Sequence, residues 1–397
     1  MSTNTEKHAP QIPVKATYMR GGTSKGTFFL LSDLPERCQT AGQARDNFLL
    51  RVVGSPDPYG KQIDGLGNGS SSTSKVVILS KSDQPEHDVN YLFGQVAIDK
   101  PMIDWSGNCG NLTAAVGSFA IQNGLIDNAK IPQNGICEVR IWQQNIRKTI
   151  IAHVPITDGK VQETGDFELD GVTFPAAEVK IEFIDPVDAD GDMFPTGNVT
   201  DTLDVPDVGN FTVTMINAGI PTIFLNAKDL GLTGTELQND INSNAEILEK
   251  LEKIRAYGAV KMGLITDIQE AQTRQHTPKI AWVASPADYT ASSGKAVKAE
   301  EIHLLARAMS MGQLHHAMMG TASVAIGTAA TISGTLPNLV AGGGNLKEIR
   351  FGHPSGTLLV GGQSEQIAGK WQAKKVSMSR SARRLMVGDV FVPSDCF

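Results

Sequence analysis

The chain has 397 residues, of which 41% are hydrophobic and 19% are charged, and its net charge is −7. This composition is typical of a soluble enzyme of two domains, and the lack of a basic, aromatic stripe argues against nucleic-acid binding. The polar N-terminus lacks a signal-peptide pattern, and no apolar run reaches the ~20 residues that span a membrane. The four cysteines (Cys38, Cys109, Cys137 and Cys396) are widely spaced, so we expect a reducing cytoplasm without disulfides or structural zinc.

A Gly-rich turn between two predicted strands, 15–19 and 27–31, opens the chain. The turn reads Arg20-Gly21-Gly22-Thr23-Ser24-Lys25-Gly26. Its glycines allow close backbone approach, its hydroxyls donate hydrogen bonds, and Arg20 offers two parallel donors to a carboxylate. An ordinary hairpin turn with solvated charges is the alternative interpretation. The turn lacks P-loop spacing and leads into a strand rather than a helix.

A Gly/Ser run over 64–74 ends at Lys75, directly before a strand of buried type predicted over 76–79. A lysine at the start of such a strand becomes partly desolvated. Burial lowers the pKa of a lysine, so that its neutral amine acts as a base. A structural or solvated lysine, after a flexible linker, is the alternative.

A lone cysteine stands in the turn Ser106-Gly107-Asn108-Cys109-Gly110-Asn111, directly before an apolar run. We predict a helix over 112–122 that is apolar nearly all round and therefore enclosed. The free N–H groups at its start form an anion site and favour a thiolate at Cys109. An inert buried thiol fits Cys109 equally well.

The second half of the chain repeats three of these segments in the same order. Residues 213–230 match 16–34, Lys279 matches Lys75, and Gly320 matches Gly110. Three matches in order predict a duplicated domain, with a second enclosed helix over 321–332. Met319 then stands in the place of Cys109. We interpret Lys279, which follows Pro278, as a structural lysine.

The remaining segments carry weaker signals. We expect a linker within 185–210, which is rich in Asp, Gly and Pro, and an amphipathic helix over 236–262 that breaks near Gly258. The pair His315-His316 has no third ligand at metal spacing, so we expect satisfied or substrate-facing histidines. The turn Gly352-His353-Pro354-Ser355-Gly356 precedes a strand at 357–360, and structural and functional interpretations of it are comparable.

Five motifs together resemble the PrpF family of 2-methylaconitate cis-trans isomerases, within the diaminopimelate epimerase-like superfamily. These motifs are Met19 to Gly26, Ser72-Thr73-Ser74-Lys75-Val76, Ser106 to Asn111, His316-Ala317-Met318-Met319-Gly320-Thr321 and Gly352 to Gly356. The resemblance covers nearly the whole chain. It implies an α+β fold of two similar domains, 1–190 and 191–397, each a β-barrel or curved sheet around a central helix. It also implies an active site in the cleft between them and a chain end that crosses back to the first domain.

The racemases of this superfamily use two cysteines, one at each helix start, and Met319 in the second place disfavours such a two-thiol enzyme. The resemblance implies that Lys75 is the base and that Cys109 lies nearby in the catalytic site. No metal or organic cofactor is implied. The residues implied for substrate binding are Arg20, Gly21, Gly22, Thr23, Ser24, Gly69, Ser70, Ser71, Ser72, Asn108, Gly110, Asn111, Met319, Gly320, Thr321 and Ser323.

The implied reaction is cis-trans isomerisation of a small tricarboxylate, 2-methylaconitate or aconitate, in the 2-methylcitrate route of propionate catabolism. A base would remove an allylic proton, the former double bond would rotate, and the proton would return to the same carbon. A homodimer is the family-level expectation. A tautomerase of an oxo acid such as 4-oxalomesaconate would use the same site, and the sequence does not separate the two. Lys75 and Cys109 beside the anion site argue against a third alternative, a non-catalytic tricarboxylate-binding protein.

Overall fold

The computed structural model describes residues 8–187 and 192–397. Eighteen of the described strands hydrogen-bond into one large mixed sheet that surrounds two buried helices. In the first half the strands are β1 (Gln11–Gly21), β2 (Ser24–Leu30), β3 (Lys75–Lys81), β4 (Val89–Val96), β5 (Ile103–Asp104), β6 (Gly135–Gln143), β7 (Lys148–Thr157), β8 (Lys160–Val161) and β9 (Glu178–Ile184). The fold is therefore of the mixed α/β kind with a large sheet.

The second half adds the other strands. They are β10 (Asp201–Val205), β11 (Gly209–Ala218), β12 (Ile220–Asn226), β13 (Lys279–Ala284), β14 (Tyr289–Thr290), β15 (Ala296–Val297), β16 (Leu304–Ser310), β17 (Gln313–Leu314), β18 (Glu348–His353), β19 (Gly356–Ile367) and β20 (Lys370–Pro393). β14 and β15 pair only with each other among these strands.

The strand pairings repeat along the chain. β1 and β2 form an antiparallel hairpin, β2 and β3 pair in parallel, and β3 and β4 pair antiparallel. The second half repeats this order: β11 and β12 pair antiparallel, β12 and β13 pair in parallel, and β13 and β16 pair antiparallel. Lys75 and Lys279, matched in the sequence, are the first residues of β3 and β13. The repeated residues thus hold equivalent places in a repeated strand order.

Two apolar helices form the centre of the packing. The helices are α1 (Gln43–Val53), α2 (Thr113–Gln122), α3 (Gln238–Asn242), α4 (Ala245–Lys261), α5 (Gly320–Ala330) and α6 (Leu336–Val340). Every residue of α5 and the first eight of α2 are buried, which confirms the predicted enclosure. A Cβ on Gly117 of α2 would lie 2.7 Å from Val154, and one on Gly327 of α5 would lie 2.5 Å from Val360. These glycines let each helix lie directly on a strand.

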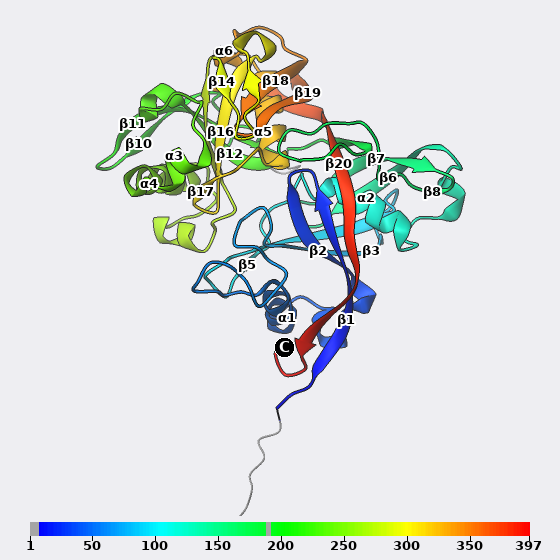
Figure 1. Cartoon of the computed structure of the whole chain (residues 1–397). Helices are drawn as coiled ribbons and strands as arrows, with labels where there is room; N and C mark the ends of the chain where they lie inside the picture. The colour runs from blue at the N-terminus through cyan, green and yellow to red at the C-terminus, as the bar shows by residue number, and fades with distance from the viewer. Residues whose placement is uncertain (1–7, 188–191) are drawn as a thin grey trace, which may run out of the picture.

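β20 is 24 residues long and joins strands from both halves of the chain. Its first part pairs with β19, its middle with β9, and residues 382–393 with β1. Figure 1 shows it as the long red strand that runs down beside β1. The chain end therefore returns to the strand with which the described chain begins.

Two sequence expectations were wrong. The helix expected over 236–262 is divided, because Asn244 caps α4 by accepting a hydrogen bond from the Ile247 N–H, and Glu236 lies before α3. Gly258 does not break α4; its missing side chain leaves room for Ile223, which a Cβ would approach to 2.3 Å. Part of the expected linker, 185–210, is strand β10, which pairs with β11.

The domain boundary expected at residue 190 lies outside the described residues, so the division at that point stays a prediction. No helix within the described ranges combines the length and the apolar character that crossing a membrane requires.

Candidate active site

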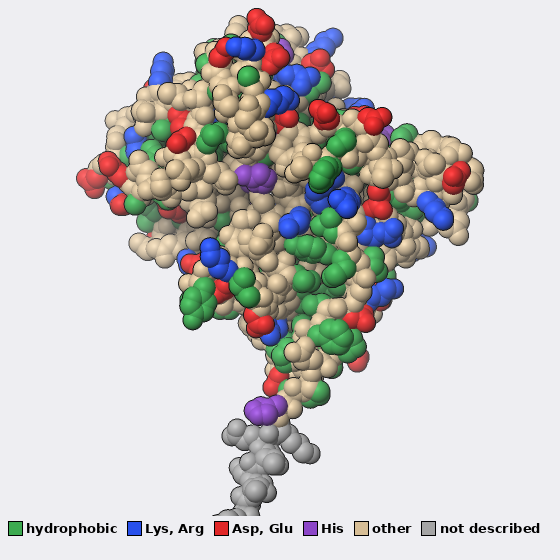
Figure 2. Space-filling model, viewed as in Figure 1, with side chains coloured by type: hydrophobic (Ala, Val, Ile, Leu, Met, Phe, Trp, Pro, Cys, Tyr) green, Lys and Arg blue, Asp and Glu red, His purple; other side chains and the backbone are tan. Residues whose placement is uncertain are grey.

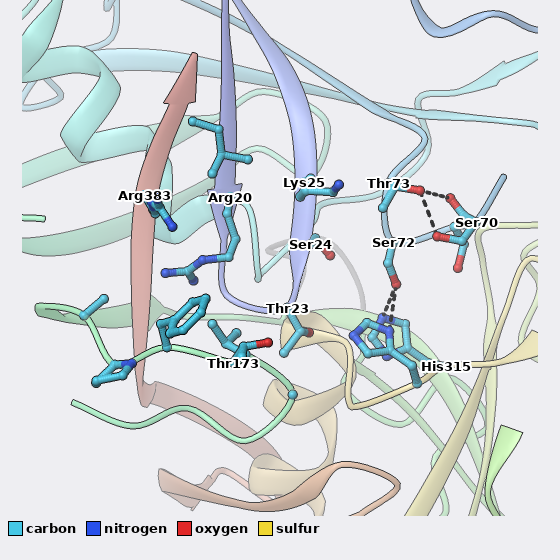
Figure 3. A pocket seen from close by; sticks show the side chains of 18 of the residues that line it. Arg20, Thr23, Ser24, Lys25, Ser70, Ser72, Thr73, Thr173, His315 and Arg383 are labelled. Carbon is cyan, nitrogen blue, oxygen red and sulfur yellow. Dashed lines mark hydrogen bonds between the residues drawn. The ribbon is translucent and has the colours of Figure 1, made fainter. Parts of the chain in front are cut away.

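Two adjoining cavities share Ser24 and His315 in their walls. The outer cavity measures about 770 Å³ and opens to the surface, whereas the inner cavity measures about 10 Å³. Figure 3 shows Ser24, Ser72 and His315 among the side chains that line the outer cavity. The outer cavity is large enough for a small organic acid. The inner one has room for about one water molecule.

The inner cavity gathers residues from both halves of the chain. Its lining consists of Ser24, Lys75, Gln95, Asn108, Cys109, Gly110, Asn111, His276, Lys279, Ser310, His315, Met319, Gly320 and Thr321. Lys75 and Cys109, the two expected catalytic residues, therefore lie in one cavity with both helix starts. The residues concerned are Gly110 and Asn111 in the turn before α2, and Gly320 and Thr321 at the start of α5.

Lys75 is buried, with 6% of its surface exposed. Its Nζ donates hydrogen bonds to the Ser71 carbonyl and, at 2.6 Å, to Gln95 Oε1. The ammonium also lies 5.8 Å from the centre of the Phe93 ring. Burial lowers the pKa of Lys75, and nearby Cys109 opposes that effect. The two oxygens and the ring stabilise the ammonium, whereas burial favours the unprotonated form that a base needs, and the direction of the pKa shift shows that burial is the larger effect.

Cys109 lies in the turn before α2, and the residue is 8% exposed. Its Sγ accepts a hydrogen bond from the Leu112 N–H at 3.4 Å, and its carbonyl accepts one from the Thr113 N–H at 3.0 Å. The helix itself begins at Thr113, one residue later than expected. The turn from Gly110 to Leu112 therefore precedes the helix and presents its N–H groups near the thiol.

The starts of α2 and α5 touch through Gly110 and Gly320. A Cβ on Gly110 would lie 2.6 Å from the Gly320 carbonyl carbon. Beside this contact, buried polar atoms of Asn108 (Oδ1 and Nδ2) and Asn111 (Oδ1) have no hydrogen-bond partner among the described residues. Buried polar atoms are nearly always paired in folded proteins, so these atoms mark a place for a polar ligand.

The outer cavity has a basic wall. Arg20, Lys25, Arg383 and Arg384 line it, and Figure 2 shows Lys and Arg side chains gathered beside the histidine at the middle of the visible face. Arg20 Nη1 donates to the Gly22 and Ser381 carbonyls, at 3.0 and 2.9 Å. Burial, and then the charge of Arg383, lower the pKa of Arg20 to about 10. Such a wall attracts anions.

Ser72 joins the two expected histidines. Its Oγ lies 3.1 Å from His315 Nε2 and 3.1 Å from His316 Nδ1 (Figure 3). The Ala317 N–H donates to His315 Nδ1, so His315 Nε2 carries the proton and donates to Ser72, whose hydroxyl then donates to His316. Groups of three or more potential metal ligands are absent from the described residues.

Thr23, Ser70 and Ser71 also line the outer cavity. Four expected binding residues line neither cavity. Gly21 and Gly22 pack against Asn111, where an added Cβ would lie 2.6 and 2.5 Å from it. The Gly69 N–H donates to Gln62 Oε1, and the Ser323 hydroxyl donates to the Met319 carbonyl. Gly69 and Ser323 therefore bond to other parts of the protein. All four residues support the residues that line the site and do not face the cavities themselves.

Sequence reasoning missed Gln95 and His276 and assigned Lys279 a structural role. Gln95 lies opposite Lys75 in the β3–β4 pairing, and His276 lies just before β13. The signal that was available for Lys279 is the repeat, which matches it to Lys75.

A mixed α/β fold that encloses a buried lysine and a buried thiol in one cavity is that of an acid–base enzyme. The PrpF protein family matches residues 11–393. The chain is 70% identical to the 2-methyl-aconitate isomerase of Shewanella oneidensis, over 97% of this chain and 98% of that one. It is 65% identical to the 2-methyl-aconitate isomerase of Cupriavidus necator, over 98% and 100% of the two chains.

The crystal structure of a methylitaconate-delta-isomerase superposes with a TM-score of 0.75 at 38% identity, covering 97% of both chains. The chain belongs to the PrpF family and is an isomerase.

Proposed function

We propose that this isomerase acts on 2-methylaconitate and interconverts its cis and trans forms. One observation carries the proposal: the buried amine of Lys75 shares a cavity with two helix starts and with buried polar atoms that lack partners. The names of the relatives at 70% and 65% identity support the same substrate. The tricarboxylate would enter through the basic outer cavity.

The reaction starts at the CH2 group between a carboxylate and the double bond. Its hydrogens are acidified by both neighbours, and the neutral Lys75 amine removes one of them. The electron pair delocalises over the former double bond onto a carboxylate, which leaves that bond with single-bond character. Rotation follows, and the Lys75 ammonium returns the proton to the same carbon. Atoms and charge balance without any oxidant or cofactor.

The developing negative charge needs donors that are already in place. The N–H groups of the turn at Gly110 and Asn111 and those at Gly320 and Thr321 supply them, and Asn108 adds a side-chain amide. Arg20, Thr23 and Ser70 to Ser72 hold the remaining carboxylates at the outer cavity. Met319 has no proton to give, which is consistent with one base acting on one carbon. Cys109 is a neighbour of that base.

The inner cavity is too small for a tricarboxylate, because it measures about 10 Å³. We therefore infer that the facing surfaces of the two expected domains, 1–190 and 191–397, part at Gly110 and Gly320 to admit the substrate and then close. Closure would exclude water from the anion that forms. We also propose that the protein acts in the cytoplasm as a homodimer. Its reaction would need no cofactor and would belong to the 2-methylcitrate route of propionate catabolism.

Incubation of the pure protein with trans-aconitate and with 2-methyl-trans-aconitate tests the proposal. We expect a change in ultraviolet absorbance and the proton NMR signals of the cis isomer, without any added metal or cofactor. Conversion of 4-oxalomesaconate alone would favour the tautomerase alternative, for which a relative at 34% identity is named. Binding of tricarboxylates without conversion or deuterium uptake would favour the non-catalytic alternative.

A further inference from the structure

Lys279 is the counterpart of Lys75 in the second half of the chain. It begins β13 as Lys75 begins β3, and each strand pairs in parallel with the second strand of a hairpin. Both side chains line the inner cavity, and Lys279 is only 2% exposed. The repeat therefore brings two buried lysines, one from each half, to a single cavity.

Lys279 lacks the partners expected of a structural lysine. Within residues 8–187 and 192–397, the hydrogen bond found for its Nζ is to His276 Nδ1 at 3.3 Å, and no carboxylate lies within ion-pair distance. Lys75, by contrast, donates to two oxygens. Burying an unpaired cation costs several kcal/mol. A lysine retained only for stability would be paired, so this one is placed for an anion that enters the cavity.

The charges around Lys279 make its protonation responsive to such an anion. The titratable and charged groups that act on it or that it acts on are Lys75, Asp104, Cys109, Arg255, His276 and His315. Burial, and then the charge of Lys75, lower the pKa of Lys279 to about 7. Two charged lysines in one small cavity repel each other, so the pair favours a single proton.

We propose that Lys279, as an ammonium, binds a carboxylate of the tricarboxylate substrate and keeps the neighbouring Lys75 amine in its neutral, basic form. This inference rests on the proposed function and adds a second lysine with a separate task to it. Asp104 acts on Lys279 without an ion pair. The anionic substrate supplies the direct ion-pair partner that Lys279 lacks among the described residues, and this pair leaves the proton on Lys279 rather than on Lys75. His276 Nδ1 accepts one of the three ammonium hydrogens, which leaves two for the carboxylate.

The test compares Lys279→Met with Lys298→Met, an exposed lysine that pairs with Asp288. Propane-1,2,3-tricarboxylate is the probe, because it is saturated and cannot react. We expect its Kd, measured by calorimetry, and the KM for trans-aconitate to rise about 10- to 100-fold in Lys279→Met, from the loss of one charged hydrogen bond. The acid limb of kcat/KM should move to higher pH, because removing a positive neighbour raises the pKa of Lys75. Lys298→Met should match the wild type.

A second measurement needs no variant. Calorimetry of the same probe at pH 8, in two buffers with different heats of ionisation, should show little net proton exchange when the wild type binds it, since the lysine pair carries one proton before and after binding and the proton only moves to Lys279. Unchanged Kd, KM and acid limb in a folded Lys279→Met, or uptake of a full proton by the wild type, which would leave Lys75 charged as well, would overturn this role. In either case the wild type would still isomerise aconitate. A wild type that neither binds the probe nor converts aconitate would overturn the proposed function as well.

Discussion

Gly110 and Gly320 hold the starts of α2 and α5 in main-chain contact: a Cβ on Gly320 would lie 2.5 Å from the Gly110 carbonyl carbon. We predict that Gly320→Ala lowers the free energy of unfolding by about 1–3 kcal/mol, because a methyl group there must push two backbones apart. Activity should fall as well, since the same N–H groups line the inner cavity. Urea unfolding and initial rates measure the two effects.

Gly388→Ala is the matched control, because a Cβ on Gly388 meets nothing within 4 Å. Its stability should stay within about 0.5 kcal/mol of the wild type. Equal effects of the two substitutions would contradict the close contact of the helix starts.

The pH dependence of stability reports on Lys279. Its pKa is about 7 in the folded chain and has an ordinary value of 10.5, so between these pH values the unfolded chain binds more protons. The free energy of unfolding should therefore rise with pH in this window. Lys279→Met removes this contribution, so the wild type should gain at most about 1.4 kcal/mol per pH unit relative to the variant. Urea unfolding of both proteins at pH 7.5 and pH 9 measures the gain, and parallel curves would contradict a buried, neutral Lys279.

Ser72 lies in the loop before β3 and forms hydrogen bonds with His315 and His316 of the second half. Because His315 is 4% exposed and donates to Ser72 Oγ, Ser72→Ala should leave a buried N–H without its partner. We expect a loss of about 1–3 kcal/mol in the free energy of unfolding. Ser293→Ala, at an exposed serine, is the control. A thermal melt that is unchanged in Ser72→Ala would show that the hydroxyl does not pair with the histidines.

The fate of the proton separates rotation from migration of the double bond. With 2-methyl-trans-aconitate in heavy water, we predict that deuterium enters the CH2 carbon alone, because Lys75 both removes and returns the proton. Proton and carbon NMR of the product locate the label. Deuterium at the methyl-bearing carbon, together with a new vinylic proton, would mean that the double bond moves instead of rotating.

The sequence was most informative where local patterns and the repeat agreed. An apolar run after a Gly-rich polar turn predicts the enclosed helix α2, and the repeat predicts α5; both helices lie within two residues of their expected bounds. Lys75 stands directly at the start of β3 as expected. Periodicity and turn chemistry are local properties, so a single sequence contains them.

Features that depend on tertiary pairing were not predictable in this way. The length of β20 is hidden because its pairing shifts at bulges opposite Tyr18/Met19 and Gln363/Ser364, and because residues 383–389 are exposed on both faces. Such a strand shows no regular alternation of apolar and polar residues. Lys279 was assigned a structural role because Pro278 precedes it, although the repeat matches it to Lys75; that both lysines reach one cavity depends on the tertiary fold.

The most direct test of the account is deuterium uptake by the substrate with Lys75→Met and with the wild type. Wild-type protein in heavy water should incorporate deuterium into trans-aconitate and form the cis isomer, and Lys75→Met should do neither, while it still binds propane-1,2,3-tricarboxylate. Its rate should fall by at least about 100-fold, the usual contribution of a general base. Exchange at the wild-type rate in a folded Lys75→Met would contradict the account, because the base would then be another group.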